Sequence, residues 1–230
     1  MVLPPASALA TLEATARDLY LRHAVDFKWS DAPLSGPVAP LCAVAGYLLV
    51  VWALVRHMAS RGGAPYAVPT WVAAGHNVVL SVGSGIMFVG CGYEAFSRWG
   101  RAGELGWVLC EAEGAKAEGA LFFWSYMYYL SKYYELLDTV IGLLRGSRMP
   151  NFGLQVYHHA VVIIMAWLWC ETAQSLQVPG LMFNTFVHVI MYAYFWARTV
   201  GIFVPKPIRL GITQLQIVQF VTSGLLLAAR

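Results

Sequence analysis

Residues 151–169, NFGLQVYHHAVVIIMAWLW, place Gln155, His158 and His159 inside a run that is otherwise almost entirely apolar. At helical spacing Gln155 lies one turn before the histidine pair, so the three side chains approach a common side of a helix. Polar groups inside so apolar a segment are costly unless other polar groups meet them. The stretch therefore predicts a buried helix whose polar partners lie elsewhere in the chain.

The composition of the whole chain indicates a membrane protein. It is 59% hydrophobic and only 12% charged, whereas soluble domains carry about 25% charged residues. Several apolar runs approach the roughly 20 residues that cross a bilayer. We therefore expect an all-α, polytopic bundle of transmembrane helices. The net charge of +3 is too small and too scattered to indicate a nucleic-acid partner.

Apolar and polar stretches alternate, and six membrane spans are expected. They cover residues 38–55, 71–91, 120–144, 151–169, 178–200 and 210–229, within a transmembrane domain at 38–230. Residues 1–37 form an amino-terminal arm, in which residues 10–23 are expected to make an amphipathic surface helix and no cleavable signal is expected. A polar loop is expected at residues 92–118.

The loops after the first, third and fifth spans carry basic residues and no acid, whereas the loops after the second and fourth are net acidic. By the positive-inside rule the first set faces the cytosol and the amino terminus is lumenal. The basic residues are Arg56, Arg61, Arg145, Arg148, Arg198, Lys206 and Arg209.

Three of the other spans also carry polar residues that lipid would not tolerate. In the third span Lys132, Glu135 and Asp138 follow one side of a helix. Unpaired charges there would each cost about 2.5–3.5 kcal/mol. Taken separately, these groups could simply brace neighbouring helices, and we assign His76 and Asn77 of the second span to such a structural role. The remaining polar stripes are His188, Met191 and Tyr192 in the fifth span and Thr213, Gln216 and Gln219 in the sixth.

These polar groups share one depth in the membrane. At 1.5 Å per residue, Asp138 lies about 10 Å before the end of its span and His158 about 10 Å after the start of its own. By the same count His188 lies about 15 Å before the end of its span, and Gln216 lies about 10 Å after the basic start of the sixth. We therefore predict one buried polar chamber that opens toward the cytosolic face.

Histidine is the residue in this chamber that can act as a nucleophile, a general base or a metal ligand. No cysteine is expected there, because all four map to the lumenal side. Since that compartment is oxidising, we predict at least one disulfide, involving Cys110. The four cysteines are Cys42, Cys91, Cys110 and Cys170.

Several of these segments resemble a known family. SKYYELLDT (131–139), LQVYHHA (154–160), NTFVHVIMYAYF (184–195) and ITQLQIVQF (212–220) are similar, in order and spacing, to the signature boxes of the ELO family of very-long-chain fatty acid elongases. AGHNVVLSVGS (74–84) resembles an early box of that family. The resemblance covers roughly residues 71–221, and four boxes in the right order make it specific.

The resemblance implies a 3-oxoacyl-CoA synthase of the endoplasmic reticulum membrane, which condenses acyl-CoA with malonyl-CoA and releases CO2 and CoA. By position, His158 is then the candidate nucleophile, with His159 and His188 as its partners in proton transfer and charge stabilisation. No metal or other cofactor is implied. The expected partners are membrane lipid, the other enzymes of the elongation cycle and a second copy in a homodimer. The expected site-lining residues are Lys132, Glu135, Asp138, Gln155, Met191, Tyr192, Thr213, Gln216 and Gln219.

The sequence departs from the family pattern at two points. Gln155 occupies the first position of the usual H-x-x-H-H box, a variant that resembles the branch acting on polyunsaturated chains. The family has seven spans, and six are expected here, so we expect these 230 residues to be part of a longer chain.

Two other functions use some of the same features. A di-iron desaturase or hydroxylase also has histidine boxes, but it needs many ligands, and two of the six histidines, His23 and His57, lie outside the chamber. A transporter could use Lys132, Glu135 and Asp138 as an ion relay, but that role leaves the histidine pair unexplained. Metal analysis and an acyl-CoA turnover assay distinguish these possibilities.

Overall fold

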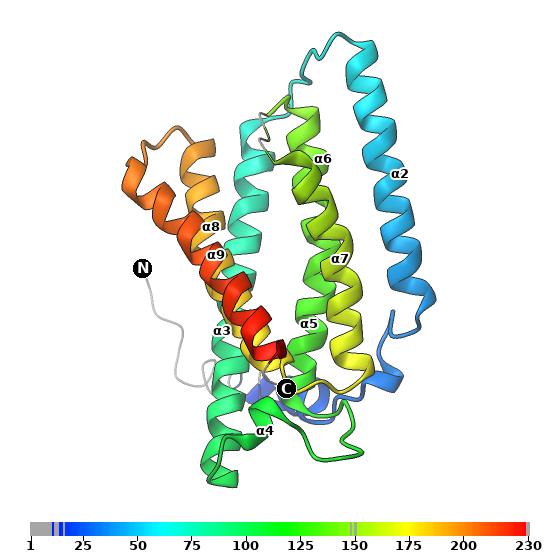
Figure 1. Cartoon of the computed structure of the whole chain (residues 1–230), viewed down its shortest axis with the longest axis vertical. Helices are drawn as coiled ribbons and strands as arrows, with labels where there is room; N and C mark the ends of the chain where they lie inside the picture. The colour runs from blue at the N-terminus through cyan, green and yellow to red at the C-terminus, as the bar shows by residue number, and fades with distance from the viewer. Residues whose placement is uncertain (1–10, 12–13, 16, 148, 150, 229–230) are drawn as a thin grey trace.

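The computed structural model describes residues 11, 14–15, 17–147, 149 and 151–228. Apart from one isolated bridge between Lys28 and Glu118, the regular structure in this part of the chain is helical. Long helices run up and down in alternation (Figure 1). The helices are η1 (Leu21–Val25), η2 (Trp29–Asp31), α2 (Val38–Ser60), α3 (Thr70–Ala102), α4 (Gly106–Leu109), α5 (Ala120–Glu135), α6 (Leu137–Leu144), α7 (Phe152–Glu171), α8 (Gln177–Thr199) and α9 (Lys206–Ala228).

Four of the described helices, α2, α3, α7 and α8, are long and apolar enough to cross a membrane. Their outer faces carry large apolar side chains, such as Leu49 on α2 and Val89 on α3, which are 63% and 68% exposed. Exposed apolar surface on this scale suits contact with lipid rather than with water. The all-α membrane architecture expected from the sequence is therefore confirmed.

The expected third span differs from the prediction. The third is not one helix, because it is divided at Leu136 into α5 and α6. The Leu136 amide donates to the Tyr133 carbonyl, three residues back, so one turn is tighter than an α-helical turn. The sixth expected span corresponds to α9, a helix of 23 residues.

The second expected span is also longer than predicted. Helix α3 continues through the first part of the expected polar loop to Ala102, where Gly103 ends it in the left-handed conformation at φ 72°. The extension is held at its far end by Arg98, which forms a two-pronged ion pair with Glu111 at 2.5 and 2.6 Å. The positive φ at Gly103 suits a residue without a Cβ.

The two ends of the bundle differ in charge. The α2–α3, α6–α7 and α8–α9 connections lie at one end (Figure 1), which we call the basic end. The opposite end, which we call the floor end, holds η1, η2, α4 and the α7–α8 connection. Arg148 lies outside the described residues. The other predicted basic residues lie near the basic end, while Glu94, Glu104, Glu111, Glu113 and Glu118 lie toward the floor end.

Helix α5 is central to the packing. It contacts α7 on one side and α3 and α8 on the other, while α2 lies against α6 and α7. Helix α9 crosses α8 obliquely (Figure 1) and has its main contact there. Consequently, polar residues on α5 face three other helices. This arrangement positions the candidate site.

The floor end is closed by residues 27–35, which we call the floor segment. The Trp29 indole donates to Glu171 at the end of α7 at 2.8 Å, and the Trp167 indole donates to the Ser35 carbonyl at 2.7 Å. The Tyr129 hydroxyl of α5 donates to the Leu34 carbonyl at 3.0 Å. Half of the expected amino-terminal arm is thus packed against the bundle.

Just before the floor segment, Tyr20 donates a hydrogen bond to Glu94 of α3. Burial, reinforced by this carboxylate, raises the pKa of the Tyr20 hydroxyl. The phenol therefore stays protonated and available as the donor. The expected amphipathic helix at residues 10–23 lies only partly within the described residues. Of these, residues 11, 14–15 and 17–20 are α-helical, and residues 21–23 belong to η1.

Two glycines allow indole rings to lie against helix backbones. A Cβ built on Gly180 of α8 would lie 2.7 Å from the Trp169 ring of α7. One on Gly90 of α3 would lie 2.1 Å from the Trp124 ring of α5. Neither distance is compatible with a side chain, so each helix approaches its neighbour closely at these points.

The predicted disulfide is not present. All four cysteines are free, with Cys42 and Cys110 exposed and Cys91 and Cys170 buried. The two buried thiols have no exposed surface and lie within the apolar core between α3, α5 and α7. Location at one end of the bundle was insufficient to predict a bridge, because a bridge also requires close and correctly directed Cβ atoms.

Candidate functional site

Helix α5 contributes a buried ion pair. The Lys132 ammonium lies 2.6 Å from Oε1 of Glu135, and both side chains are 2% exposed. The ammonium also donates to Oδ1 of Asn184 on α8 at 3.1 Å and lies 4.0 Å from the centre of the Tyr128 ring. Glu135 in turn faces Nδ1 of His188, on α8, at 3.5 Å. These contacts join α5 to α8 through charged groups.

Asp138, three residues further on, is shared by three other helices. Its Oδ1 lies 2.7 Å from Nε2 of His76 on α3. Its Oδ2 accepts a hydrogen bond from the Tyr192 hydroxyl of α8 at 2.6 Å. The same oxygen lies 4.0 Å from Nε2 of His159 on α7. The Asp138 carboxylate is therefore the point at which α3, α7 and α8 meet α6.

A neutral branch extends from this cluster to α2. The Thr139 hydroxyl, which is fully buried, lies 2.9 Å from the Tyr47 hydroxyl. It also accepts a hydrogen bond from the Gln155 amide at 3.4 Å. The Tyr47 ring lies 6.3 Å from the His159 ring, edge to face. Gln155 is thus placed as a donor at the edge of the site.

His158 differs from the other two predicted histidines. Its ring lies 5.7 Å from that of His159 and 6.0 Å from that of Phe220 on α9, both edge to face. Within the described residues neither ring nitrogen of His158 has a side-chain or backbone hydrogen-bond partner. By contrast, His159 and His188 each face a carboxylate. The ring nitrogens of His158 are therefore not paired with any group among the described residues.

Of the three polar residues predicted on α9, Gln216 and Gln219 are half-buried and Thr213 is exposed. The Gln216 amide lies 3.2 Å from the sulfur of Met191 on α8, and both residues are half-buried. Gln219 is also half-buried. Thr213 is exposed, and its hydroxyl donates to the Arg209 carbonyl of its own helix. The structure therefore places Thr213 away from the histidines.

Four residues of the hydrogen-bond network were outside the predicted site: Tyr47, His76, Thr139 and Asn184. His76 carried a usable signal, because it lies six residues after the start of α3 at Thr70, which is about 9 Å from the basic end at 1.5 Å per residue. That is the depth of the other polar groups. Asn184 begins the NTFVHVIMYAYF motif and could have been included on the same ground.

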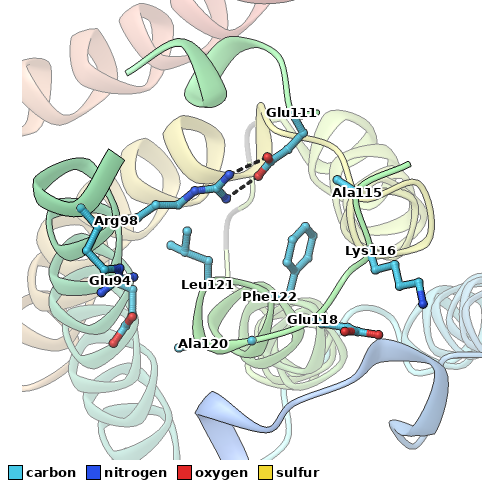
Figure 2. A pocket seen from close by; sticks show the side chains of 11 residues that line it. Glu94, Arg98, Glu111, Ala115, Lys116, Glu118, Ala120, Leu121 and Phe122 are labelled. Atoms are coloured by element: carbon cyan, nitrogen blue, oxygen red, sulfur yellow. Dashed lines mark hydrogen bonds and ion pairs between the residues drawn. The ribbon is translucent and has the colours of Figure 1, made fainter. Parts of the chain in front are cut away.

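The described cavities lie elsewhere. One of about 310 Å³ at the floor end is lined by Glu94, Arg98, Glu111, Lys116 and Glu118, among others. Arg98 and Glu111 form their ion pair at its wall (Figure 2). It contains none of the predicted site residues. The histidine cluster is the candidate site, because nucleophilic and acid–base groups converge there. Among the described residues, no three histidine, cysteine or carboxylate side chains are grouped to hold a metal ion.

Comparisons with known proteins agree with this architecture. Residues 32–229 match the ELO: GNS1/SUR4 family. Fatty acid elongase sre1 of Dictyostelium discoideum is 33% identical over 205 residues, 88% of this chain and 74% of that protein. Fatty acid elongase 3-like of Arabidopsis thaliana is 27% identical over 193 residues, 76% of this chain and 64% of that protein.

Long chain fatty acid elongase 2 of Caenorhabditis elegans is 32% identical over 178 residues, 77% of this chain and 63% of that protein. The chain spans between 63% and 74% of the length of these three relatives. Because the family match extends over most of the sequence and includes every helix of the polar cluster, this chain belongs to the ELO family and is a multi-pass helical membrane protein.

Proposed function

We propose that this protein carries out the condensing step of fatty acid elongation, as a 3-oxoacyl-CoA synthase. In that reaction acyl-CoA and malonyl-CoA give 3-oxoacyl-CoA, CO2 and free CoA. Family membership supports elongation in general. The observation that supports the specific reaction is the arrangement of the three predicted histidines. His188 faces Glu135 of the buried Lys132–Glu135 pair, His159 faces Asp138, and His158 lies beside the His159 ring.

His158 is the proposed nucleophile. A nitrogen lone pair attacks the thioester carbonyl, the C–S bond breaks, and CoA leaves as a thiolate that takes up a proton. The resulting acyl-imidazole holds the acyl group. Malonyl-CoA then loses CO2, its enolate carbon attacks the acyl carbonyl, and the imidazole is released. The unpaired ring nitrogens of His158 suit this role better than the carboxylate-facing rings of His159 and His188.

The other two histidines are suited to proton transfer and to stabilising charge. His188 faces Glu135 through Nδ1 at 3.5 Å, which leaves Nε2 for the reacting groups. His159 faces Asp138 at 4.0 Å. A carboxylate behind an imidazole fixes its orientation and stabilises the imidazolium form. We assign these two residues to the thioester oxygen and to the departing thiolate.

The positive charge at the basic end supports binding of the CoA part of each substrate at that end of the bundle. Basic side chains at the basic end, including Arg145, Lys206 and Arg209, could form charge-assisted contacts with CoA phosphates. The Nη1 atom of Arg145 is buried and has no hydrogen-bond partner among the described residues. We propose that this end faces the cytosol and that the protein resides in the endoplasmic reticulum membrane, with the acyl chain in contact with lipid.

Further properties rest on the same proposal. Gln155 at the first position of the histidine motif resembles the branch of the family that acts on polyunsaturated chains, and this resemblance supports a polyunsaturated acyl-CoA as substrate. The 3-oxoacyl-CoA product must be reduced and dehydrated before another round, which implies association with the enzymes of those steps. A homodimer is proposed as well.

Product analysis tests this proposal. The purified protein is given malonyl-CoA and a panel of acyl-CoAs of different length and unsaturation, and the products are identified by mass spectrometry. We expect 3-oxoacyl-CoA two carbons longer than the substrate, most rapidly from polyunsaturated chains. With acyl-CoA alone, intact-mass analysis should show an acyl adduct that maps to His158. Absence of elongated product with every acyl-CoA would overturn the proposed activity, and elongation without an adduct would overturn the nucleophile.

A further inference from the structure

His76 on α3 is joined to the histidine cluster through Asp138. Its Nε2 lies 2.7 Å from Oδ1 of Asp138, and its side chain is 5% exposed. The ring is also packed against Tyr134, with ring centres 5.0 Å apart. Because the His76 ring is buried and fixed in place, any effect it has on the site passes through its contact with Oδ1 of Asp138. The Asp138 carboxylate is also the group that faces His159.

The tautomer of His76 follows from its two nitrogens. Nδ1 is buried and has no partner among the described residues. If Nδ1 carried a proton, a buried N–H donor would be left without an acceptor, which is costlier than an unused lone pair. The neutral ring with its proton on Nε2 satisfies the contact with Asp138. His76 therefore donates, and Oδ1 of Asp138 accepts.

Each oxygen of Asp138 then has a separate assignment. Oδ1 accepts from His76, while Oδ2 accepts from Tyr192 at 2.6 Å and faces Nε2 of His159 at 4.0 Å. If the bond at Oδ1 were lost, the carboxylate could rotate about its Cβ–Cγ bond and place either oxygen before Tyr192. The distance and direction from Asp138 to His159 would no longer be fixed.

We propose that His76 is a positioning residue for condensation, acting through Asp138 on His159. This inference rests on the proposed function. The groups that face the His76–Asp138 pair are His159 from α7, Tyr192 from α8 and Tyr134 from α5. Misplacement of a reacting group by about 1 Å costs on the order of 100-fold in rate, and we expect a loss of that size.

The kinetic test compares two replacements of His76. His76→Leu removes the donor, whereas the amide nitrogen of His76→Gln can occupy a position close to Nε2 and donate to Asp138. With the best acyl-CoA of the panel, we expect His76→Leu to lower kcat about 100-fold and to leave KM within about twofold. His76→Gln should recover kcat to within about fivefold of the wild type.

Ser81→Ala is the matched control. Ser81 lies on the same helix, and its hydroxyl donates to the Val189 carbonyl of α8 at 3.0 Å without contacting the cluster. Its loss should lower thermal stability while kcat stays unchanged. If Ser81→Ala and His76→Leu reduced kcat alike, or if His76→Leu retained the wild-type kcat, the positioning role would be overturned.

A measurement independent of turnover separates this inference from the proposed function. In protein labelled with ¹⁵N-histidine, NMR should show His76 as the Nε2–H tautomer. The side-chain signals of His159 should move in His76→Leu and return toward the wild-type positions in His76→Gln. Those results without any elongation by the wild type would refute the proposed activity and retain the His76–Asp138–His159 connection. Unmoved His159 signals in a folded His76→Leu protein would overturn the connection itself.

Discussion

The histidine cluster and the floor segment are held together by opposite means. At the cluster, buried charges from α5 and α6 meet imidazoles from α3, α7 and α8. At the floor end, indole and phenol side chains donate to backbone carbonyls and to one glutamate. Loss of one partner in the histidine cluster leaves a buried charge unpaired, which lowers the stability of the folded protein strongly. In the floor segment, the stabilisation is spread over several hydrogen bonds that each contribute a modest amount. The comparison separates the proposed reacting region, which is the histidine cluster, from the floor segment, which holds the helices together.

The largest effect is expected at His158. His158 is the proposed nucleophile, so His158→Ala should lower the rate of elongation at least about 1,000-fold. The fold should stay intact, because the His158 ring has no hydrogen-bond partner among the described residues. Initial rates of 3-oxoacyl-CoA formation and the thermal unfolding midpoint measure the two quantities. Full activity in this variant, or loss of folding in parallel with activity, would remove the distinction between the reacting and holding regions.

A large effect on stability is expected at the buried ion pair. Lys132→Met leaves the Glu135 carboxylate buried without its main partner, which should cost about 3–5 kcal/mol. Replacing both residues in Lys132→Met/Glu135→Leu should cost less than Lys132→Met alone, because no unpaired charge remains. Unfolding in detergent compares the three proteins. A double variant less stable than the single one would show that the pair stabilises the bundle beyond charge neutralisation.

A smaller change is expected at Gln155. Its amide donates to Thr139 at 3.4 Å, so Gln155→Leu should lower kcat/KM by about tenfold through loss of a hydrogen bond next to the site. Gln155→His keeps a donor and should retain most of the activity, with a shifted preference across the acyl-CoA panel. Equal rates in the two variants would be incompatible with a hydrogen-bonding role.

The smallest effect is expected in the floor segment. Trp29→Phe keeps an aromatic ring but loses the indole donor to Glu171, which should lower the free energy of unfolding by about 1.5 kcal/mol. The elongation rate should remain that of the wild type, because the residue contacts none of the histidines. Paired measurements of unfolding and kcat check this. A fall in kcat at unchanged stability would place the floor segment within the reacting region.

Sequence spacing was sufficient to choose the expected third, fourth and fifth spans as elements of the cluster. Counting 1.5 Å per residue from the basic ends placed Asp138, His158 and His188 at one depth, and the structure brings Asp138 to His159 and Glu135 to His188. Periodicity defines the face of one helix, however, and not the neighbour that this face meets. The contact of His76 with Asp138 depends on α3 packing beside α5, which no spacing within α3 indicates.

Two other features could not be obtained from periodicity. The tighter turn at Leu136 interrupts a segment whose apolar pattern continues without a glycine or proline at the break. The floor segment has no regular pattern, and its structure depends on tryptophan and tyrosine partners more than 90 positions away along the chain. Both depend on tertiary contacts that local sequence does not specify.

The indole of Trp169 against Gly180 limits how α7 and α8 can move. A Cβ at Gly180 would lie 2.7 Å from the ring, so sliding α8 along its axis would move the ring out of the space that Gly180 leaves and toward side chains one turn away on the same face. The two helices cannot slide past each other near the floor end without expelling the ring from its place. Any relative motion that separates His158 on α7 from His188 on α8 must therefore be a pivot about this contact, widest at the basic end and least at the floor.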